Sequence, residues 1–376
     1  MHTFSIIYIF FAFYLLVILL YRGYGLKQGK VENIFMLISF LILTIFHVGV
    51  NVESVEDLPL YESAFNRIAA ASGSDIFNQY RSQEYLFIIA NKVVAFISKD
   101  FVFFLLIYNL FFFLSHYLII REYSPYVPIS IVVLLIYNYN QSLFVLRQYM
   151  AISILLFTIP CIIKGKIIPY LVLCVMAFFT HYSSIIWLPI YFMYGIKKKR
   201  VFILSAVAFT LFFILMRSDL GKLMIFVFNM DAYDAYMVEN KIDIKQIIIP
   251  SLYLVFYVFS LKKHIFDLGM NKICFIALLI IVIGYAFAPG MNQVGRMLQY
   301  FQTLSIISIP ITVSYIKSKP LRFVYLFSVI TLNGYLTNKG LYEFYFIHYK
   351  FGGFNMTYYI IIFLVGIWLM RKSQLA

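Results

Sequence analysis

Two arginines and one histidine lie inside or at the edges of long apolar stretches of this 376-residue chain. Arg147 lies in NYNQSLFVLRQYMA, His181 in AFFTHYSS and Arg296 in VGRMLQYFQ. An ionisable side chain in apolar surroundings is costly, which makes each of them a candidate for function. Each also has a simpler interpretation. An arginine can anchor a helix at a membrane surface, and a lone histidine can be an ordinary hydrogen-bonded polar group.

Both arginines have a polar neighbour at a useful position. Gln148 directly follows Arg147, and Tyr300 follows Arg296 by four residues, which puts the two on one face of a helix. Arginine is always charged and makes bidentate contacts, so it suits a diphosphate. A pair of arginines can neutralise the charge that builds on a pyrophosphate leaving group without a metal.

Three further residues stand in a polar segment earlier in the chain. Asp57 and Tyr61 are four residues apart in VEDLPLYESAF, and Glu84 begins EYLFIIANK. Carboxylates in such a segment can be ordinary surface charges. Alternatively, Asp57, Glu84 or His181 could accept a proton from a hydroxyl group. Together with the arginines, they would equip a protein to transfer a group from a lipid diphosphate to a hydroxyl.

The composition decides what kind of elements must position these residues. Hydrophobic residues make up 63% of the chain and charged residues 12%, whereas soluble domains have about 25% charged residues. Disordered chains are polar and rich in charge, so disorder is excluded as well. The sequence therefore predicts an all-α polytopic membrane protein, with residues 1–376 forming a single integral membrane domain.

We predict about thirteen transmembrane helices, within a range of about eleven to fourteen, because a span needs roughly 20 apolar residues. The expected spans cover residues 4–21, 31–49, 101–120, 126–139, 142–162, 167–180, 182–196, 201–217, 246–261, 272–289, 296–315, 321–335 and 356–370. Three long external segments are expected at residues 50–100, 218–245 and 336–355. Glu84–Ser98 is apolar on one face, which predicts an amphipathic or interfacial helix.

The lysines and arginines predict the orientation of these spans. With the N-terminus outside, seven short basic loops fall on the cytoplasmic side, with 18 of the 30 Lys and Arg residues but 3 of the 16 Asp and Glu residues. The net charge of +14 is then a cytoplasmic excess that orients the protein, so it indicates no nucleic-acid partner. The C-terminus falls in the cytoplasm, and Arg147, His181 and Arg296 fall toward the outer face.

No cofactor or metal is expected. The three cysteines lie in apolar segments without a CxxC pair, and no P-loop or dinucleotide fingerprint is present. The N-terminus lacks a charged leader and a cleavage site, so residues 4–21 are expected to be a first span. Any group that is transferred must therefore arrive on an activated substrate.

The chain resembles the EpsG/Wzy-type bacterial polysaccharide polymerases, through five spaced motifs that cover most of its length. DLPLYESAF resembles the family's Asp–x3–Tyr–x3–Phe element, and EYLFIIANKVV resembles its Glu-led helix, with Tyr85 where proline is common. LRQYMAISILLF resembles the Arg-Gln-x-x-Ala helix. The stretch KGKIIPYLVLCVMAFFTHYSSIIWLPI resembles the basic turn that precedes a His-x-Ser element, and VGRMLQYF resembles the later Arg–x3–Tyr-Phe element.

The resemblance implies a fold, a reaction and a set of roles. It implies a GT-C-like architecture with an extracytoplasmic cavity, in the bacterial cytoplasmic membrane. The reaction would transfer a growing glycan from undecaprenyl diphosphate to another lipid-linked repeat unit, and a chain-length regulator is a possible further partner. Arg147 and Arg296 would bind the diphosphate, with Gln148, Tyr61 and Tyr300 as further substrate contacts. Glu84, Asp57 or His181 would activate or orient the acceptor hydroxyl.

Three other functions compete with this one. A flippase for lipid-linked oligosaccharides should show pseudo-symmetric halves and charges along a path to the cytoplasm. A membrane O-acyltransferase acting on polysaccharide would need a histidine near the cytoplasmic face, whereas His181 is predicted outside. An assembly scaffold would leave two semi-buried arginines unexplained. The outer clustering of the polar residues favours the polymerase.

Overall fold

The computed structural model describes residues 30–49, 52–55, 57–71, 84–139, 141–217, 244–267, 269–288 and 292–329. Within these ranges all regular secondary structure is helical. The chain divides into two compact units, one of Met1–Ser153 with Phe327–Ala376 and the other of Ile154–Leu326. We describe each unit by itself.

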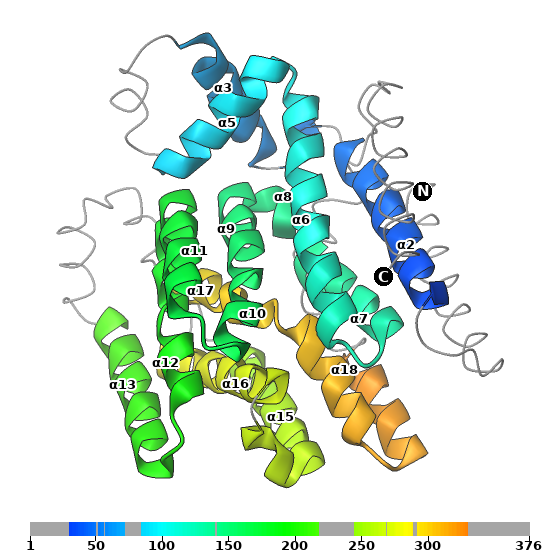
Figure 1. The fold of residues 1–376 in the computed structure, drawn as a ribbon, viewed down its shortest axis with the longest axis vertical. Helices are drawn as coiled ribbons and strands as arrows, with labels where there is room; N and C mark the ends of the chain where they lie inside the picture. Colours follow the sequence, from blue (N-terminus) through cyan, green and yellow to red (C-terminus); the bar gives the residue numbers. More distant parts are fainter. Residues whose placement is uncertain are drawn as a thin grey trace. The chain divides into compact units, whose positions relative to one another are not determined.

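The first unit is built around a long apolar helix, α6, at Phe101–Tyr123. Asp100 starts this helix, because its side chain accepts a hydrogen bond from Val102 N at 2.9 Å and satisfies a backbone donor of the first turn. Figure 1 shows α2 (Lys30–Val48) alongside α6, and the two helices pack together. Buried phenylalanines such as Phe112 and Phe113 form much of the α6 core.

Two shorter helices, α3 (Leu58–Ala70) and α5 (Tyr85–Ile97), cross each other and contact α6 (Figure 1). Pro59 stands in the first turn of α3, where its missing N–H costs nothing. Both faces of α5 are apolar. Phe87 and Ile88 are buried, whereas Val93 and Phe96 are exposed.

The rest of the first unit is a broken helical run. It consists of α7 (Val127–Leu134), a π-helical turn η2 (Leu135–Tyr139), α8 (Gln141–Phe144) and α9 (Leu146–Leu156). A short 3-10 turn, η1 (Val52–Ser54), precedes α3. Buried tyrosines hold the break in place. Tyr108 Oη donates to Ser142 O at 2.7 Å, and Tyr139 Oη donates to Leu43 O at 3.2 Å.

The second unit packs around α16 (Met270–Phe287), which contacts α12 (Pro189–Gly195), α13 (Lys199–Arg217), α15 (Ile244–Leu261), α17 (Asn292–Gln302) and α18 (Ser305–Tyr315). The remaining elements are α10 (Thr158–Ile163), α11 (Ile167–Thr180), η3 (Tyr182–Trp187), η5 (Lys262–Phe266) and a helix over 319–329 that continues past the unit's end. Gly165, with φ of +66°, makes the turn from α10 to α11.

The described helices confirm the predicted class. Four helices are long and apolar enough to cross a membrane: Phe101–Tyr123, Leu146–Ile163, Ile244–Phe266 and Met270–Phe287. A fifth is possible if the bent pair Val127–Leu134 and Tyr137–Phe144 forms one span. Shorter apolar helices accompany them at Met36–Ile45, Tyr85–Ile97, Ile167–Thr180, Arg200–Leu215 and Ser305–Tyr315. The described part of the chain is therefore all-α, and the chain is a multi-pass membrane protein.

Some predicted segments take a different form or lie elsewhere. The stretch 182–196, expected as one span, is broken into η3 and α12 at Pro189. Helix α11 has 14 residues, about 21 Å of helix, which is short of a hydrocarbon core of about 30 Å. The predicted spans at 4–21 and 356–370 lie outside the described residues, as do nearly all of the segment 218–245 and the whole of 336–355.

Candidate functional site

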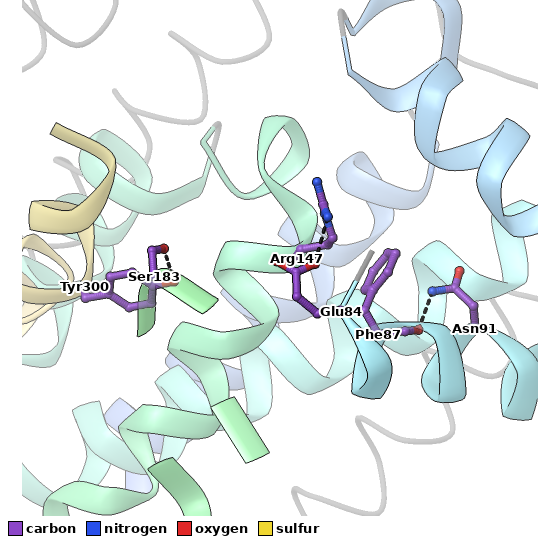
Figure 2. A network of polar contacts seen from close by, with 6 residues as sticks. All are labelled: Glu84, Phe87, Asn91, Arg147, Ser183 and Tyr300. Atoms are coloured by element: carbon purple, nitrogen blue, oxygen red, sulfur yellow. Dashed lines mark hydrogen bonds and ion pairs between the residues drawn. The ribbon is translucent and has the colours of Figure 1, made fainter. Parts of the chain in front are cut away.

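The first unit brings together two of the predicted site residues that are 63 positions apart in the sequence. Arg147 Nη1 lies 2.7 Å from Glu84 Oε2, and the two side chains form an ion pair. Figure 2 shows them pointing toward each other, one from α9 and one from the start of α5. The Glu84 side chain is 2% exposed and that of Arg147 is 27% exposed, so the carboxylate is buried while the guanidinium stays partly accessible.

Local backbone structure places these two side chains. Glu84 directly precedes α5 with extended φ and ψ of −72° and 141°, and its carboxylate makes no capping hydrogen bond to that helix. Arg147 lies in the first turn of α9, after Val145 interrupts the run from α8. An arginine that only anchors a helix at the membrane surface needs no buried partner. The ion pair of Arg147 with the buried Glu84 carboxylate therefore favours a functional role for Arg147.

Tyr61 joins this pair from α3. Its hydroxyl is within hydrogen-bonding reach of the Arg147 guanidinium. Burial raises the pKa of the Tyr61 hydroxyl, an effect that the nearby Arg147 opposes. The phenol therefore stays neutral near pH 7. Phe87 of α5 packs edge-to-face against the Tyr61 ring, with ring centroids 6.1 Å apart.

Asp57 and Gln148 flank this group. Asp57 is the half-buried residue before α3, and its backbone carbonyl accepts a hydrogen bond from Tyr61 N at 3.2 Å. Its negative charge also raises the pKa of the Tyr61 hydroxyl, although less than burial does. Gln148 is 1% exposed. We use the name Arg147 cluster for Glu84, Arg147 and Tyr61 only, because these three share one guanidinium.

The second unit holds the other three predicted residues. His181 lies between α11 and η3 in an extended conformation and is 7% exposed. Its N–H ends α11 with a 2.8 Å bond to Ala177 O, and its carbonyl accepts from Ser184 N at 3.0 Å. Arg296 is half-buried on α17, one turn before Tyr300. The predicted helix over these two residues is confirmed.

Tyr300 connects α17 to η3. Its hydroxyl oxygen lies 3.0 Å from Ser183 Oγ, and the pair is drawn in Figure 2. Trp187 of η3 stacks on Phe301 of α17, with centroids 5.7 Å apart and planes 15° apart. Near this junction, Ser184 Oγ and Gln299 Oε1 are buried and have no hydrogen-bond partner among the described residues. A polar ligand or a water molecule would satisfy such atoms.

Lys92 on α5 is a positioning residue that the sequence analysis did not select. Its Nζ donates to Ile68 O at 3.1 Å, to Ala69 O at 3.3 Å and to Ala71 O, all at the end of α3. The signal was present in the sequence, because Lys92 is a cation within the apolar run YLFIIANKVVAFI. The same criterion that selected Arg147 would have found it.

The described residues contain no group of three His, Cys, Asp or Glu side chains that could hold a metal ion. In the Arg147 cluster, the partly exposed guanidinium is the group that can donate hydrogen bonds to an anion. A guanidinium has five N–H donors in one plane, and one of its nitrogens, Nη1, contacts Glu84 at 2.7 Å.

Of the comparisons with known proteins, the comparison with protein families gives a match. No curated protein and no solved structure matches the chain significantly. The family comparison confirms the predicted resemblance, because the model of the EpsG family matches residues 33–351. That match covers most of the 376 residues, and the chain belongs to the EpsG family.

Proposed function

We propose that this membrane protein of polysaccharide biosynthesis is a polysaccharide polymerase. It transfers a growing glycan from undecaprenyl diphosphate to the sugar hydroxyl of another lipid-linked repeat unit, at the outer face of the bacterial cytoplasmic membrane. Family membership supports polysaccharide biosynthesis in general. The observation that carries the finer proposal is the partly exposed Arg147 guanidinium, fixed by a buried carboxylate.

The reaction breaks the bond between the anomeric carbon of the donor glycan and a diphosphate oxygen. A new glycosidic bond forms between that carbon and the acceptor oxygen, and undecaprenyl diphosphate leaves. Negative charge grows on the diphosphate as the bond breaks, so a fixed guanidinium such as Arg147 binds the transition state more tightly than the substrate. We assign the same role to Arg296.

The acceptor hydroxyl must lose a proton as it attacks. Asp57, His181 and Glu84 are the candidates from the sequence for accepting that proton or for orienting the hydroxyl. Gln148, Tyr61 and Tyr300 are proposed as further substrate contacts. No step requires a metal or a nucleotide, because the diphosphate is itself the activated leaving group.

The proposal includes an architecture. We propose about thirteen spans in a GT-C-like arrangement with an extracytoplasmic cavity, the N-terminus outside and the C-terminus in the cytoplasm. The support is the apolar pattern of the chain and the position of its basic loops. A chain-length regulator is the protein partner that we propose.

A purified-component assay tests the function. The full chain, in lipid nanodiscs with a synthetic undecaprenyl-diphosphate repeat unit, should produce a ladder of longer glycans without added metal or nucleotide. Arg147→Ala and Arg296→Ala should each reduce the elongation rate by about 100-fold or more, which is typical for loss of a charged transition-state contact. The exposed Arg200 of α13 supplies a matched control, and Arg200→Ala should elongate normally.

Unchanged elongation by both arginine variants would contradict the proposed roles. If the wild-type protein moves the lipid-linked unit across a bilayer and never lengthens it, the chain is a flippase and the polymerase proposal is wrong. Acyl transfer to the glycan from an acyl donor would support the O-acyltransferase alternative instead.

A further inference from the structure

Glu84 and Arg147 differ sharply in what can reach them. The Glu84 side chain is 2% exposed, whereas the Arg147 side chain, 2.7 Å away, is 27% exposed. A substrate that approaches this pair therefore meets the guanidinium. A general base must come within about 3 Å of the hydroxyl from which it takes a proton, and the burial of Glu84 denies it that contact.

Charge also argues against proton transfer to Glu84. If the Glu84 carboxylate took a proton, its ion pair with Arg147 would be lost. Removing one partner of a buried ion pair is strongly unfavourable, because the other charge is left uncompensated.

Three separate elements converge on the one guanidinium. Glu84 comes from the residue before α5, Tyr61 from α3 and Arg147 from α9. Helices α3 and α5 pack against each other, and both pack against α6. Two acceptors from a packed pair of helices leave a planar guanidinium little freedom to rotate, so its remaining N–H groups keep one direction.

We propose that Glu84 is a positioning residue that acts on the reaction only through Arg147, and that it is not the general base. This inference rests on the proposed function. Its consequence is that Glu84 sets how well the lipid diphosphate is bound and held in line. The base for the acceptor hydroxyl then lies among the other candidates, Asp57 and His181.

Steady-state kinetics of the full-length protein separate the two roles. For Glu84→Gln we expect kcat/KM for the synthetic lipid diphosphate to fall about 10-fold or more, because the Arg147 guanidinium is held less well. The acidic limb of the kcat–pH profile should stay at the wild-type pH, because the group that titrates there is still present. Glu84→Asp, which keeps the charge, should recover part of the lost kcat/KM. Glu122→Gln, at an exposed carboxylate near the end of α6, should behave as wild type.

A double-mutant cycle gives an independent test. If Glu84 acts only through Arg147, then Glu84→Gln combined with Arg147→Gln should lose no more kcat/KM than Arg147→Gln alone. If Glu84 were the base, the two losses would multiply, since they would arise from different steps. Each variant is first checked for a single symmetrical peak in size-exclusion chromatography and for a thermal transition.

The outcomes are distinguishable from failure of the polymerase itself. If the wild-type protein makes no ladder, the proposed function is wrong. If it makes a ladder, an unchanged kcat/KM in Glu84→Gln overturns the inference, because Arg147 then works without its carboxylate partner. Loss of the acidic limb in that variant, or multiplying losses in the cycle, would overturn it as well. Should Glu84→Gln fail to fold, the kcat/KM and the pH profile of Glu84→Asp decide the same question.

Discussion

The residues most relevant to chemistry in this chain act through partners that are distant in sequence. Arg147 forms an ion pair with Glu84 at 2.7 Å, and the Tyr300 hydroxyl lies 3.0 Å from Ser183 Oγ across 117 positions. In each contact one side chain is buried, Glu84 in the first and Tyr300 in the second, so losing the contact removes a hydrogen-bond partner from a buried polar group, which is costly. The effect of a substitution at one of these positions therefore includes the cost to the partner residue, which loses a hydrogen bond or an ion pair.

Tyr61 supplies the first prediction at this scale. Tyr61→Phe keeps the ring against Phe87 but removes the oxygen beside Arg147. We expect a KM for the lipid diphosphate about 3- to 10-fold higher, because one hydrogen bond to a charged group is lost. Since burial raises the pKa of the Tyr61 hydroxyl, the wild type and Tyr61→Phe should have parallel pH profiles up to about pH 9.

The control for this prediction is Tyr126→Phe, at the residue before α7. It should leave the kinetics unchanged. A pH profile that changes shape in Tyr61→Phe would mean that Tyr61 itself titrates during the reaction, contrary to the direction of its pKa shift.

The sequence could suggest candidate residues but could not pair them. Arg147, Glu84 and Tyr61 were selected because of their types and the motifs around them. Nothing in those motifs states that Glu84 faces Arg147, since the contact depends on how α5 and α9 are placed by the helices between them. Asn91 shows the opposite case. It donates to Phe87 O one turn earlier on the same helix, at 2.7 Å, a contact that helical spacing alone allows.

At the scale of secondary structure, basic side chains donate hydrogen bonds to the last carbonyls of helices in both units. Lys92 donates to carbonyls at the end of α3, Lys272 donates to Tyr194 O and Ile196 O at the end of α12, and Arg322 donates to Ile316 O after α18. The last carbonyls of a helix have no partner within it and carry a partial negative charge, so a cation there is stabilising. These basic residues therefore stabilise the ends of helices by direct hydrogen bonds.

Lys92 gives a prediction on helix placement. Lys92→Met should destabilise the packing of α3 on α5 by about 1–3 kcal/mol, because the carbonyls at the end of α3 lose their donor. Hydrogen exchange should become faster in the last turn of α3. Lys92→Arg should restore much of the protection. Lys99→Met, at an exposed lysine beyond the end of α5, serves as the control. Equal exchange in the two methionine variants would contradict the capping role.

Gly284 gives a second prediction, on the contact between α16 and α17. A Cβ at this position would lie 2.7 Å from Leu298 Cδ2 and 2.8 Å from its Cδ1. Gly284→Ala should therefore reduce stability by about 1–3 kcal/mol, as overpacking usually does. It should also lower elongation, since α17 carries Arg296 and Tyr300.

A second substitution tests whether this steric contact is the cause. In Gly284→Ala with Leu298→Ala, the loss of stability should be smaller than the sum of the two single losses, because the methyl group fills part of the space that leucine vacates. Gly195→Ala, where an added Cβ meets nothing within 4 Å, is the control. Additive losses in thermal unfolding would show that the clash is not responsible.

At the scale of the whole molecule, the charge distribution predicts which side each loop occupies. The chain carries a net charge of +14, and the basic loops that we place in the cytoplasm account for that excess. Lys272, one of the basic residues counted in these loops, is nevertheless buried. It is 3% exposed, and its Nζ donates hydrogen bonds to two backbone carbonyls. A basic residue that counts toward the predicted cytoplasmic charge can therefore be buried in the folded protein.

Cysteine labelling tests the orientation. In a background with Cys161, Cys174 and Cys274 replaced by alanine, a cysteine at exposed Lys198 should react with an impermeant thiol reagent only from the cytoplasmic face. A cysteine at exposed Ser63 of α3 should react from the outer face of intact cells. Reaction of the two positions from the same side would contradict the predicted topology.

The sequence by itself determined the class of this protein and its family, because hydropathy, charge and motif spacing are local properties of the chain. It also suggested Arg147, Glu84 and Tyr61 as separate candidates. The tertiary structure alone decided that Glu84 is buried, that Arg147 is partly exposed and that three elements meet at one guanidinium. The physical reason is that a side chain's exposure and partners depend on the packing of helices that are distant in sequence, and no periodicity within a single helix encodes that packing.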